Sequence, residues 1–327
     1  MKHIFIYNPM AGKDSTAAIA ALKEKMKEYD GKLDYEFYDT KAAGDATVYV
    51  RKRCEETQEE LRFYACGGDG TANEVLHGLV GCPNASMTCY PCGSGNDYVK
   101  YYGGAAKFLD IDALIAGTEK AVDIMKVDDR YALNVINFGF DTVVAETMIK
   151  VKHKKIIGGK HAYTTGIMKA LLTAMKIKGE VFVDGEKLNE GKMLLCTVAN
   201  GKYVGGSFCC APRSVNDDGL LEVCLFKPIS RFTFIKVVGV YEKGQHLDDP
   251  RFAKHIVYRR GKSVRVSAPE GFAFSLDGEI VRKNEFTIEI CPGALRFVVP
   301  AEPAAAEDDV PPAEEAKTAA EQEPATV

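Results

Sequence analysis

The stretch LRFYACGGDGTANEV, residues 61–75, decides the fold of the first half of the chain. Its first six residues are mostly apolar and predict a strand. The glycines that follow permit a tight turn and let a ligand approach the backbone. Thr71 and Glu74 have the spacing of a capping box, which predicts that a helix begins there. Because free N–H groups and the helix dipole favour an anion at a helix start, the stretch predicts a phosphate site.

Asp69 stands inside this predicted phosphate site. A carboxylate would repel phosphate unless a cation lay between them, and Mg²⁺ commonly bridges carboxylates to phosphates. A glycine-rich turn with an acid added for solubility is the simpler interpretation. The strand, the glycines, the acid and the helix start together favour a site for phosphate and metal.

Strands and helices alternate from the start of the chain to about residue 125. The pattern predicts strands at 3–9, 33–40, 61–66 and 85–91, and helices at 15–29, 46–58, 71–80 and from 97. Such units predict an α/β lobe in which helices cover both faces of a parallel sheet.

The region 126–291 has a different texture. It contains short β-rich pieces separated by Asp-Gly and Asn-Gly turn signals, with helices predicted at 163–177 and 232–243. We therefore expect an antiparallel β lobe here, with the active site in the cleft between the two lobes.

A second glycine-rich turn, PCGSGND at residues 91–97, follows the fourth predicted strand. Ser94 and Asn96 can hydrogen-bond a nucleotide, and Asp97 can cap a helix or contact the water shell of a metal. Ligands of open α/β sheets bind at the carboxyl ends of the strands, where both turns lie. The chain contains neither a P-loop nor a full GxGxxG motif, which disfavours a dinucleotide dehydrogenase.

These motifs together resemble the diacylglycerol kinase catalytic domain family, and within it the bacterial diacylglycerol kinase-like lipid kinases. Two later segments extend the resemblance, NDDGLL at 216–221 and LDGE at 276–279, and the motifs keep the family's order over residues 1 to about 300. The resemblance implies a nucleotide lobe, a C-terminal β-sandwich lobe, and a segment 292–300 that returns to the first lobe.

The resemblance also implies ATP and Mg²⁺ as cofactors and assigns residues to them. The residues expected at the nucleotide are Asn8, Thr40, Gly68, Thr71, Ser94 and Asn96, together with Lys13, Gly67, Gly70 and Gly95 of the same turns. The acids expected at metal are Asp69, Asp97, Asp217 and Asp218. Position 45 is Asp, where the family usually has His.

Asp277 is expected to be the general base, with Glu279 beside it. An Asp is adequate because the base in a loose phosphoryl-transfer transition state mainly orients the hydroxyl. Asp69 or Glu279 could share the task. An ordinary Asp-Gly hairpin is the simpler interpretation of this turn.

Composition sets limits on partners and location. The chain has 327 residues, 46% hydrophobic and 27% charged, and no apolar run of the ~18 residues that a membrane span requires. The segment 301–327 is rich in Ala, Glu and Pro and is expected to be a flexible acidic tail. The net charge of this segment is −7 and that of the whole chain is −4, so residues 1–300 carry a net charge of +3. A positive charge on this part suits an anionic partner.

We expect a cytoplasmic protein that meets its lipid substrate at a membrane surface, without nucleic acid. The basic run 150–155 could face that surface, although a solvated helix face is the simpler interpretation. Homodimerisation cannot be read from the sequence.

The main functional hypothesis is an ATP-dependent lipid kinase that converts diacylglycerol to phosphatidic acid. An NAD kinase-like or other small-molecule kinase shares the GGDGT turn, but Asn73-Glu74-Val75 and the turn at 93–97 favour the lipid branch. An inactive lipid- or nucleotide-binding regulator is the third hypothesis. The retained acids disfavour it.

Overall fold

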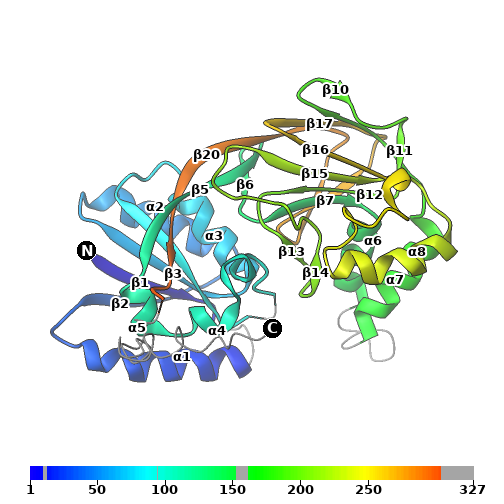
Figure 1. Ribbon diagram of the computed structural model, residues 1–327. Coiled ribbons are helices and arrows are strands. Elements are labelled where there is room, and N and C mark those ends of the chain that lie inside the picture. Colours follow the sequence, from blue (N-terminus) through cyan, green and yellow to red (C-terminus); the bar gives the residue numbers. More distant parts are fainter. Residues whose placement is uncertain (10–12, 94, 152–160, 303–327) are drawn as a thin grey trace, which may run out of the picture.

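The computed structural model describes residues 1–9, 13–93, 95–151 and 161–302, which form two lobes side by side (Figure 1). The predicted tail beyond residue 302 and most of the basic run 150–155 lie outside the described residues. None of the helices in these ranges is long and apolar enough to cross a bilayer.

The N-terminal lobe is built on a parallel sheet with strand order β2-β1-β3-β4. Helix α1 lies on one side of the sheet and α2 and α3 on the other (Figure 1). The elements are β1 (Lys2–Tyr7), α1 (Lys13–Met26), a 3-10 turn (Lys27–Tyr29), β2 (Asp34–Asp39), α2 (Asp45–Glu56), β3 (Leu61–Gly67), α3 (Asp69–Leu79), β4 (Ala85–Pro91), a 3-10 helix (Tyr98–Tyr102), α4 (Ala105–Phe108), α5 (Ile111–Ile115) and β5 (Thr118–Val127). This arrangement confirms the predicted α/β lobe.

The C-terminal lobe is an antiparallel β-sandwich, as the sequence predicts. Its elements are β6 (Arg130–Ala132), β7 (Val135–Gly139), α6 (Phe140–Val151), α7 (Ala162–Thr173), β8 (Ile177–Lys178), β9 (Glu180–Val183), β10 (Glu186–Lys187), β11 (Lys192–Met193), β12 (Leu195–Ala199), β13 (Tyr203–Val204), β14 (Phe208–Cys209), β15 (Leu221–Phe226), α8 (Arg231–Glu242), a 3-10 turn (Ala253–His255), β16 (Ile256–Gly261), β17 (Ser263–Ser267), β18 (Ala273–Leu276), β19 (Glu279–Arg282) and β20 (Glu285–Val299).

Three layers make up this lobe. One sheet has the order β16-β15-β12-β7-β18-β19 and packs one face against strands β9, β17, β20 and β5. Ile136 and Phe138 of β7 point into that core, whereas Val135 belongs to a second core shared with α6, α7 and α8. Because both faces of the sheet are covered, its central strands are almost fully buried.

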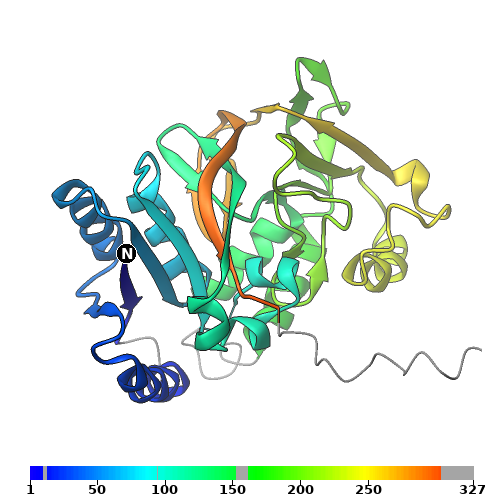
Figure 2. The same ribbon diagram turned by 60° about the vertical axis from the view of Figure 1, so that its left-hand side comes forward.

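Strand β20 joins the lobes. Its first half pairs with β17 in the C-terminal lobe, and Phe297 near its end pairs in parallel with Met87 of β4. Figure 2 shows the strand bending between the two lobes. A bulge between Cys291 and Leu295 interrupts its pairing with β5.

Asp123 holds that bulge in place. Its two carboxylate oxygens accept hydrogen bonds from Gly293 N and Gly219 N, each at 2.7 Å. The bend of β20 and the turn at 216–219 are therefore fixed by one buried side chain.

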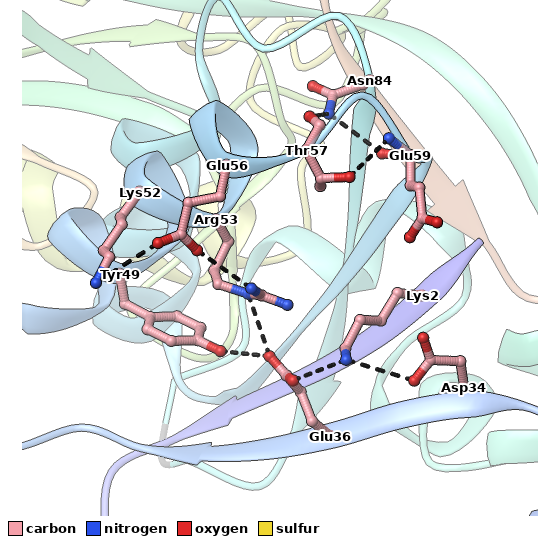
Figure 3. A network of polar contacts seen from close by, with 10 residues as sticks. All are labelled: Lys2, Asp34, Glu36, Tyr49, Lys52, Arg53, Glu56, Thr57, Glu59 and Asn84. Carbon is pink, nitrogen blue, oxygen red and sulfur yellow. Dashed lines mark hydrogen bonds and ion pairs between the residues drawn. The ribbon is translucent and has the colours of Figure 1, made fainter.

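A polar network anchors α2 to the open edge of the N-terminal sheet (Figure 3). Glu36 on β2 accepts a hydrogen bond from Tyr49 and lies 3.3 Å from Arg53 Nε and 3.0 Å from Lys2 Nζ. Charged side chains on an edge strand also discourage pairing with another chain.

Several predicted helix boundaries are wrong. Helix α3 begins at Asp69 with Gly68 as its N-cap and no side-chain capping bond, so the Thr71–Glu74 capping box does not form. Thr71 instead packs over Gly67. A Cβ atom added to Gly67 would lie 2.3 Å from Thr71 Oγ1. The helix expected from residue 97 is a 3-10 helix without a cap from Asp97. The helix predicted at 163–177 ends at Thr173.

Candidate active site

The two glycine-rich turns lie against each other at the carboxyl ends of β3 and β4. Gly93 N donates to Gly67 O at 3.0 Å, and a Cβ atom on Gly93 would lie 2.4 Å from Gly68 N. Only glycine permits this approach of two backbones. The predicted phosphate-binding turns therefore form one continuous backbone surface.

Asn8 and Thr40 lie near the same edge of the sheet. Asn8 follows β1, and Thr40 follows β2 with its backbone N bonded to Tyr7 O at 2.9 Å. Asp45, which stands where the family usually has His, accepts hydrogen bonds from Lys41 N and the Tyr38 hydroxyl. The side chain of Lys13 and the whole of Ser94 lie outside the described residues.

Asp69 projects from the start of α3 towards the second turn. Its Oδ1 accepts a hydrogen bond from Asp97 N at 2.9 Å, and a Cβ atom on Gly95 would lie 2.1 Å from its Oδ2. Burial, followed by the negative charges of Asp97 and Asp277, raises the pKa of Asp69 to about 6. An acid in this range can exchange a proton near neutral pH.

Asp97 links the two lobes. Its Oδ1 accepts hydrogen bonds from Lys100 Nζ at 2.5 Å and from Gly206 N at 3.1 Å, and Lys100 also donates to Gly206 O. The turn at 205–206 of the C-terminal lobe is therefore fixed over the second glycine-rich turn.

Asp277 occupies a tight turn between β18 and β19, with a φ of 46°. Its carboxylate accepts hydrogen bonds from three successive backbone groups, Leu133 N, Asn134 N and Val135 N, at 2.6–3.1 Å. A fourth comes from Asn73 Nδ2 of α3 at 3.3 Å. Burial raises its pKa, while these bonds oppose the shift. Four donors fill the acceptor positions of a carboxylate.

A cavity of about 560 Å³ opens at these acids and continues into the C-terminal lobe. Its mouth includes Asp69, Asn73, Gly95, Asp97, Asn134, Gly206 and Asp277. Its interior lies among α6, α7, α8 and the facing sheet, and includes Phe140, Asp141, Val144, Met148, Tyr163, Ile167, Leu195, Phe208, Phe226, Phe234, Val237 and Tyr241. The polar end of the cavity is therefore lined by residues of both lobes, and the apolar end is lined by residues of the C-terminal lobe.

The remaining predicted acids lie elsewhere. Asp218 is paired with Arg260, and Asp217 is exposed. Glu279 is exposed, lies 3.7 Å from Arg130 and does not line the cavity. Asp69, Asp97 and Asp277 are thus the predicted acids that the structure brings together.

Asp69 and Asp97 are the residues of the mouth that could contact a magnesium ion carried in with a nucleotide. Within the described ranges, no three His, Cys, Asp or Glu side chains lie close enough to hold a metal by themselves. Mg²⁺ usually keeps several waters and takes one or two carboxylates plus substrate phosphates. The pKa of Asp69 is raised first by burial and then by the negative charges of Asp97 and Asp277, and a cation would offset the effect of those charges.

Sequence reasoning missed the residues that shape the cavity. Helix α6, which supplies Phe140 and Val144, was not predicted, because its apolar start continues the run of β7. In the sequence Asn73 is only part of a motif, although its side chain donates a hydrogen bond to Asp277 of the other lobe. The bond from Asp97 to Gly206 joins positions 109 residues apart, and no local pattern indicates it.

The chain matches two family models that together span most of the described residues. Residues 2–127 match the Diacylglycerol kinase catalytic domain, and residues 134–299 match the YegS C-terminal NAD kinase beta sandwich-like domain. The second match alone covers half of the chain.

Individual proteins show the same likeness. A Diacylglycerol kinase of Bacillus subtilis is 29% identical over 282 residues, covering 84% of this chain and 88% of that protein. A protein of Pseudomonas aeruginosa named Probable lipid kinase YegS-like is 28% identical over 301 residues, covering 91% and 94%. The crystal structure of a diacylglycerol kinase from Bacillus anthracis shares the fold, with a TM-score of 0.70, 23% identity, and coverage of 93% and 98%.

The two lobes, the paired turns and these matches define a lipid kinase. The chain belongs to the family of the diacylglycerol kinase catalytic domain and the YegS-like lipid kinases.

Proposed function

We propose that this kinase transfers the γ-phosphoryl group of ATP to the free hydroxyl of diacylglycerol, giving phosphatidic acid and ADP. The observation that carries the proposal is the continuous cavity, with acids at its mouth and an apolar interior. A lipid alcohol has the same two parts, a polar hydroxyl end and apolar chains. A charged dinucleotide or sugar phosphate has no apolar part for the interior.

Each lobe has a part in the proposed reaction. The turns at 67–71 and 93–97 offer backbone N–H groups to the phosphates, as helix starts do. Asp69 and Asp97 would contact Mg²⁺ through its water shell, which leaves the Asp69 carboxylate able to take up a proton, and the ion would neutralise phosphate charge when bound. Asp277 positions the 133–135 segment opposite them.

Asp69 is better suited than Asp277 to receive the proton. The four hydrogen bonds of Asp277 leave no acceptor position for a substrate hydroxyl. Asp69 lines the cavity and has one hydrogen bond among the described residues. In the proposed step the lipid oxygen bonds to the γ-phosphorus, the bond to the β–γ bridging oxygen breaks, and the hydroxyl proton moves to Asp69.

The test is purified protein with labelled ATP, Mg²⁺ and a panel of diacylglycerol, NAD and fructose 6-phosphate, with mass analysis of products. We expect phosphatidic acid. Phosphorylated NAD or sugar without phosphatidic acid would support the small-molecule kinase hypothesis, and no product with any alcohol would favour an inactive regulator.

We also propose that an anionic bilayer lies against α7 and α8. Met168 and Leu172 on α7, and Phe232 and Ile235 on α8, are large apolar side chains exposed to solvent. Arg231 donates to the carbonyl oxygens of Leu171 and Leu172, so the two groups adjoin.

Charge and continuity favour lipid as the partner of this face. Exposed cations lie among the apolar side chains, namely Lys169, Arg231 and Lys236. Basic groups beside an apolar face are typical of binding to anionic membranes. The same helices enclose the cavity, so a lipid could enter without crossing water.

Vesicle sedimentation tests whether this face of α7 and α8 binds to a membrane. Replacing Leu172 and Phe232 together by Ser should lower binding to anionic vesicles severalfold, because two apolar anchors are lost. Val48→Ser, at an exposed apolar position of the other lobe, is the matched control. Equal binding of the double variant and the control would remove this face from the proposal.

A further inference from the structure

Asp141 lies in the interior of the cavity, in the first turn of α6. Its Oδ2 is buried and has no hydrogen-bond partner among the described residues. Its nearest titratable neighbours include Tyr163, Tyr241 and Cys210, whose pKa values are raised by burial and then by the charge of Asp141. No Lys or Arg within the described ranges pairs with it.

An unpaired carboxylate in such surroundings takes up a proton more readily than one in water. Burial alone raises the pKa of Asp141 to about 6. A lipid that fills the cavity would displace the remaining water and raise the pKa further. The neutral acid has an O–H donor, which needs an acceptor inside the cavity.

Neighbouring protein groups do not supply that acceptor. The Tyr241 hydroxyl already lies 3.3 Å from Thr197 Oγ1, and no hydrogen bond joins Asp141 to Tyr163 in the part of the chain that the structure describes. Among the described residues the acceptor is therefore not supplied by the protein, and a molecule that fills the cavity can supply it. A buried donor left without an acceptor is destabilising.

We propose that Asp141, as a neutral acid, donates a hydrogen bond to an ester carbonyl of the bound lipid and so selects acyl esters over alkyl ethers. This proposal rests on the proposed lipid-kinase function. An ester carbonyl is the strongest acceptor that a diacylglycerol brings below its free hydroxyl, and that hydroxyl is used at the mouth. A dialkylglycerol has the same shape without a carbonyl. Asp141 is thus a specificity-determining residue in the interior.

The test compares kcat/KM for dioctanoylglycerol and its ether analogue dioctylglycerol, with full-length protein in mixed micelles. We expect the ester-to-ether ratio to be roughly 10 or more for the natural chain. Asp141→Asn keeps a donor and should keep most of the ratio. Asp141→Leu has none, and its ratio should fall to about 1.

Glu146→Gln is the matched control, since Glu146 lies on the same helix but bonds to Arg282 and does not line the cavity. Its ratio should equal that of the natural chain. A natural ratio near 1, an unchanged ratio in Asp141→Leu, or an equal loss in Asp141→Asn would overturn the proposal. Preferred turnover of a long-chain amino alcohol would also overturn it, because that result indicates a charged Asp141 that binds an ammonium group.

Thermal stabilisation by the two lipids separates this proposal from the proposed function. If no lipid is phosphorylated but the ester stabilises the protein more than the ether, and does so only with Asp or Asn at position 141, the function fails and the inference stands. If lipids are phosphorylated without discrimination, the inference alone fails.

Discussion

At the mouth of the cavity, side chains from both lobes meet, whereas the interior is enclosed by the C-terminal lobe alone. The acids of the mouth are fixed by named partners: Asp97 N holds Asp69, Gly206 N holds Asp97, and four donors hold Asp277. The interior is shaped by apolar packing of three helices on a sheet. Side chains at the mouth are therefore positioned by specific hydrogen bonds, whereas the interior is defined mainly by its volume.

This difference separates two kinds of effect. Changes at the mouth should act on the rate of phosphoryl transfer, because geometry and charge there affect the transition state. Changes in the interior should act on lipid affinity, because apolar contacts are similar in the ground state and the transition state. Each experiment below tests that division.

Asp69→Asn should have the largest effect. We expect kcat to fall about 10³-fold, because the amide cannot accept the proton. The melting temperature should stay equal or rise, since a neutral amide relieves the charge shared with Asp97 and Asp277. Turnover within tenfold of the natural chain would contradict the role of Asp69.

Gly95→Ala tests whether the position of that carboxylate matters. A Cβ atom would lie 2.1 Å from Asp69 Oδ2, so the carboxylate must move. A displacement of about 1 Å should lower kcat roughly 10²-fold. Gly239→Ala in α8 is the control, because its Cβ atom meets nothing within 4 Å. Equal rates in the two variants would mean that the mouth tolerates such movement.

Val237→Phe tests the interior. The larger ring fills part of the cavity and should exclude roughly two methylene groups of a long chain, which loses about 1.6 kcal/mol, or roughly 15-fold in KM for lipid. The KM for ATP should not change. Val48→Phe, at a position of α2 that is 67% exposed, should leave both values unchanged. A fall in kcat with unchanged lipid KM would contradict the expectation that the interior acts on lipid affinity and the mouth on the rate of phosphoryl transfer.

The pH dependence should be the smallest effect near neutrality. The pKa of Asp69 is about 6, raised by burial, and the proposed reaction needs its charged form. At saturating lipid, kcat/KM for ATP should therefore be level above about pH 7 and fall roughly tenfold per pH unit below about 6. The residual activity of Asp69→Asn should not show this fall at low pH. A flat profile in the natural chain would argue against Asp69 as the proton acceptor.

The sequence predicted the mouth better than the interior for a physical reason. Each glycine-rich turn follows directly on its strand, so strand, turn and acid are local signals. Asn73 and Asp277 are 204 residues apart, and their contact depends on how the lobes meet. The apolar residues of α6 and α8 have no distinguishing pattern, because the same residue types would form an ordinary core.

Asp141 is a second example of a residue whose importance could not be predicted from the local sequence. In the sequence it is one acid after the apolar run of β7, without a motif around it. That its Oδ2 has no partner among the described residues becomes visible only when its surroundings are known. A buried group that is unsatisfied by its own chain cannot be recognised from local pattern.

The path of β20 has a consequence for how the protein assembles during synthesis. The sheet of the first lobe borders β20, whose pairing with β4 involves Phe297. This lobe therefore lacks that strand until residues 285–299 have left the ribosome. Domains usually fold in order as they emerge. Here the N-terminal part must wait with the edge of β4 exposed, and a fragment ending near residue 127 would keep that open edge permanently.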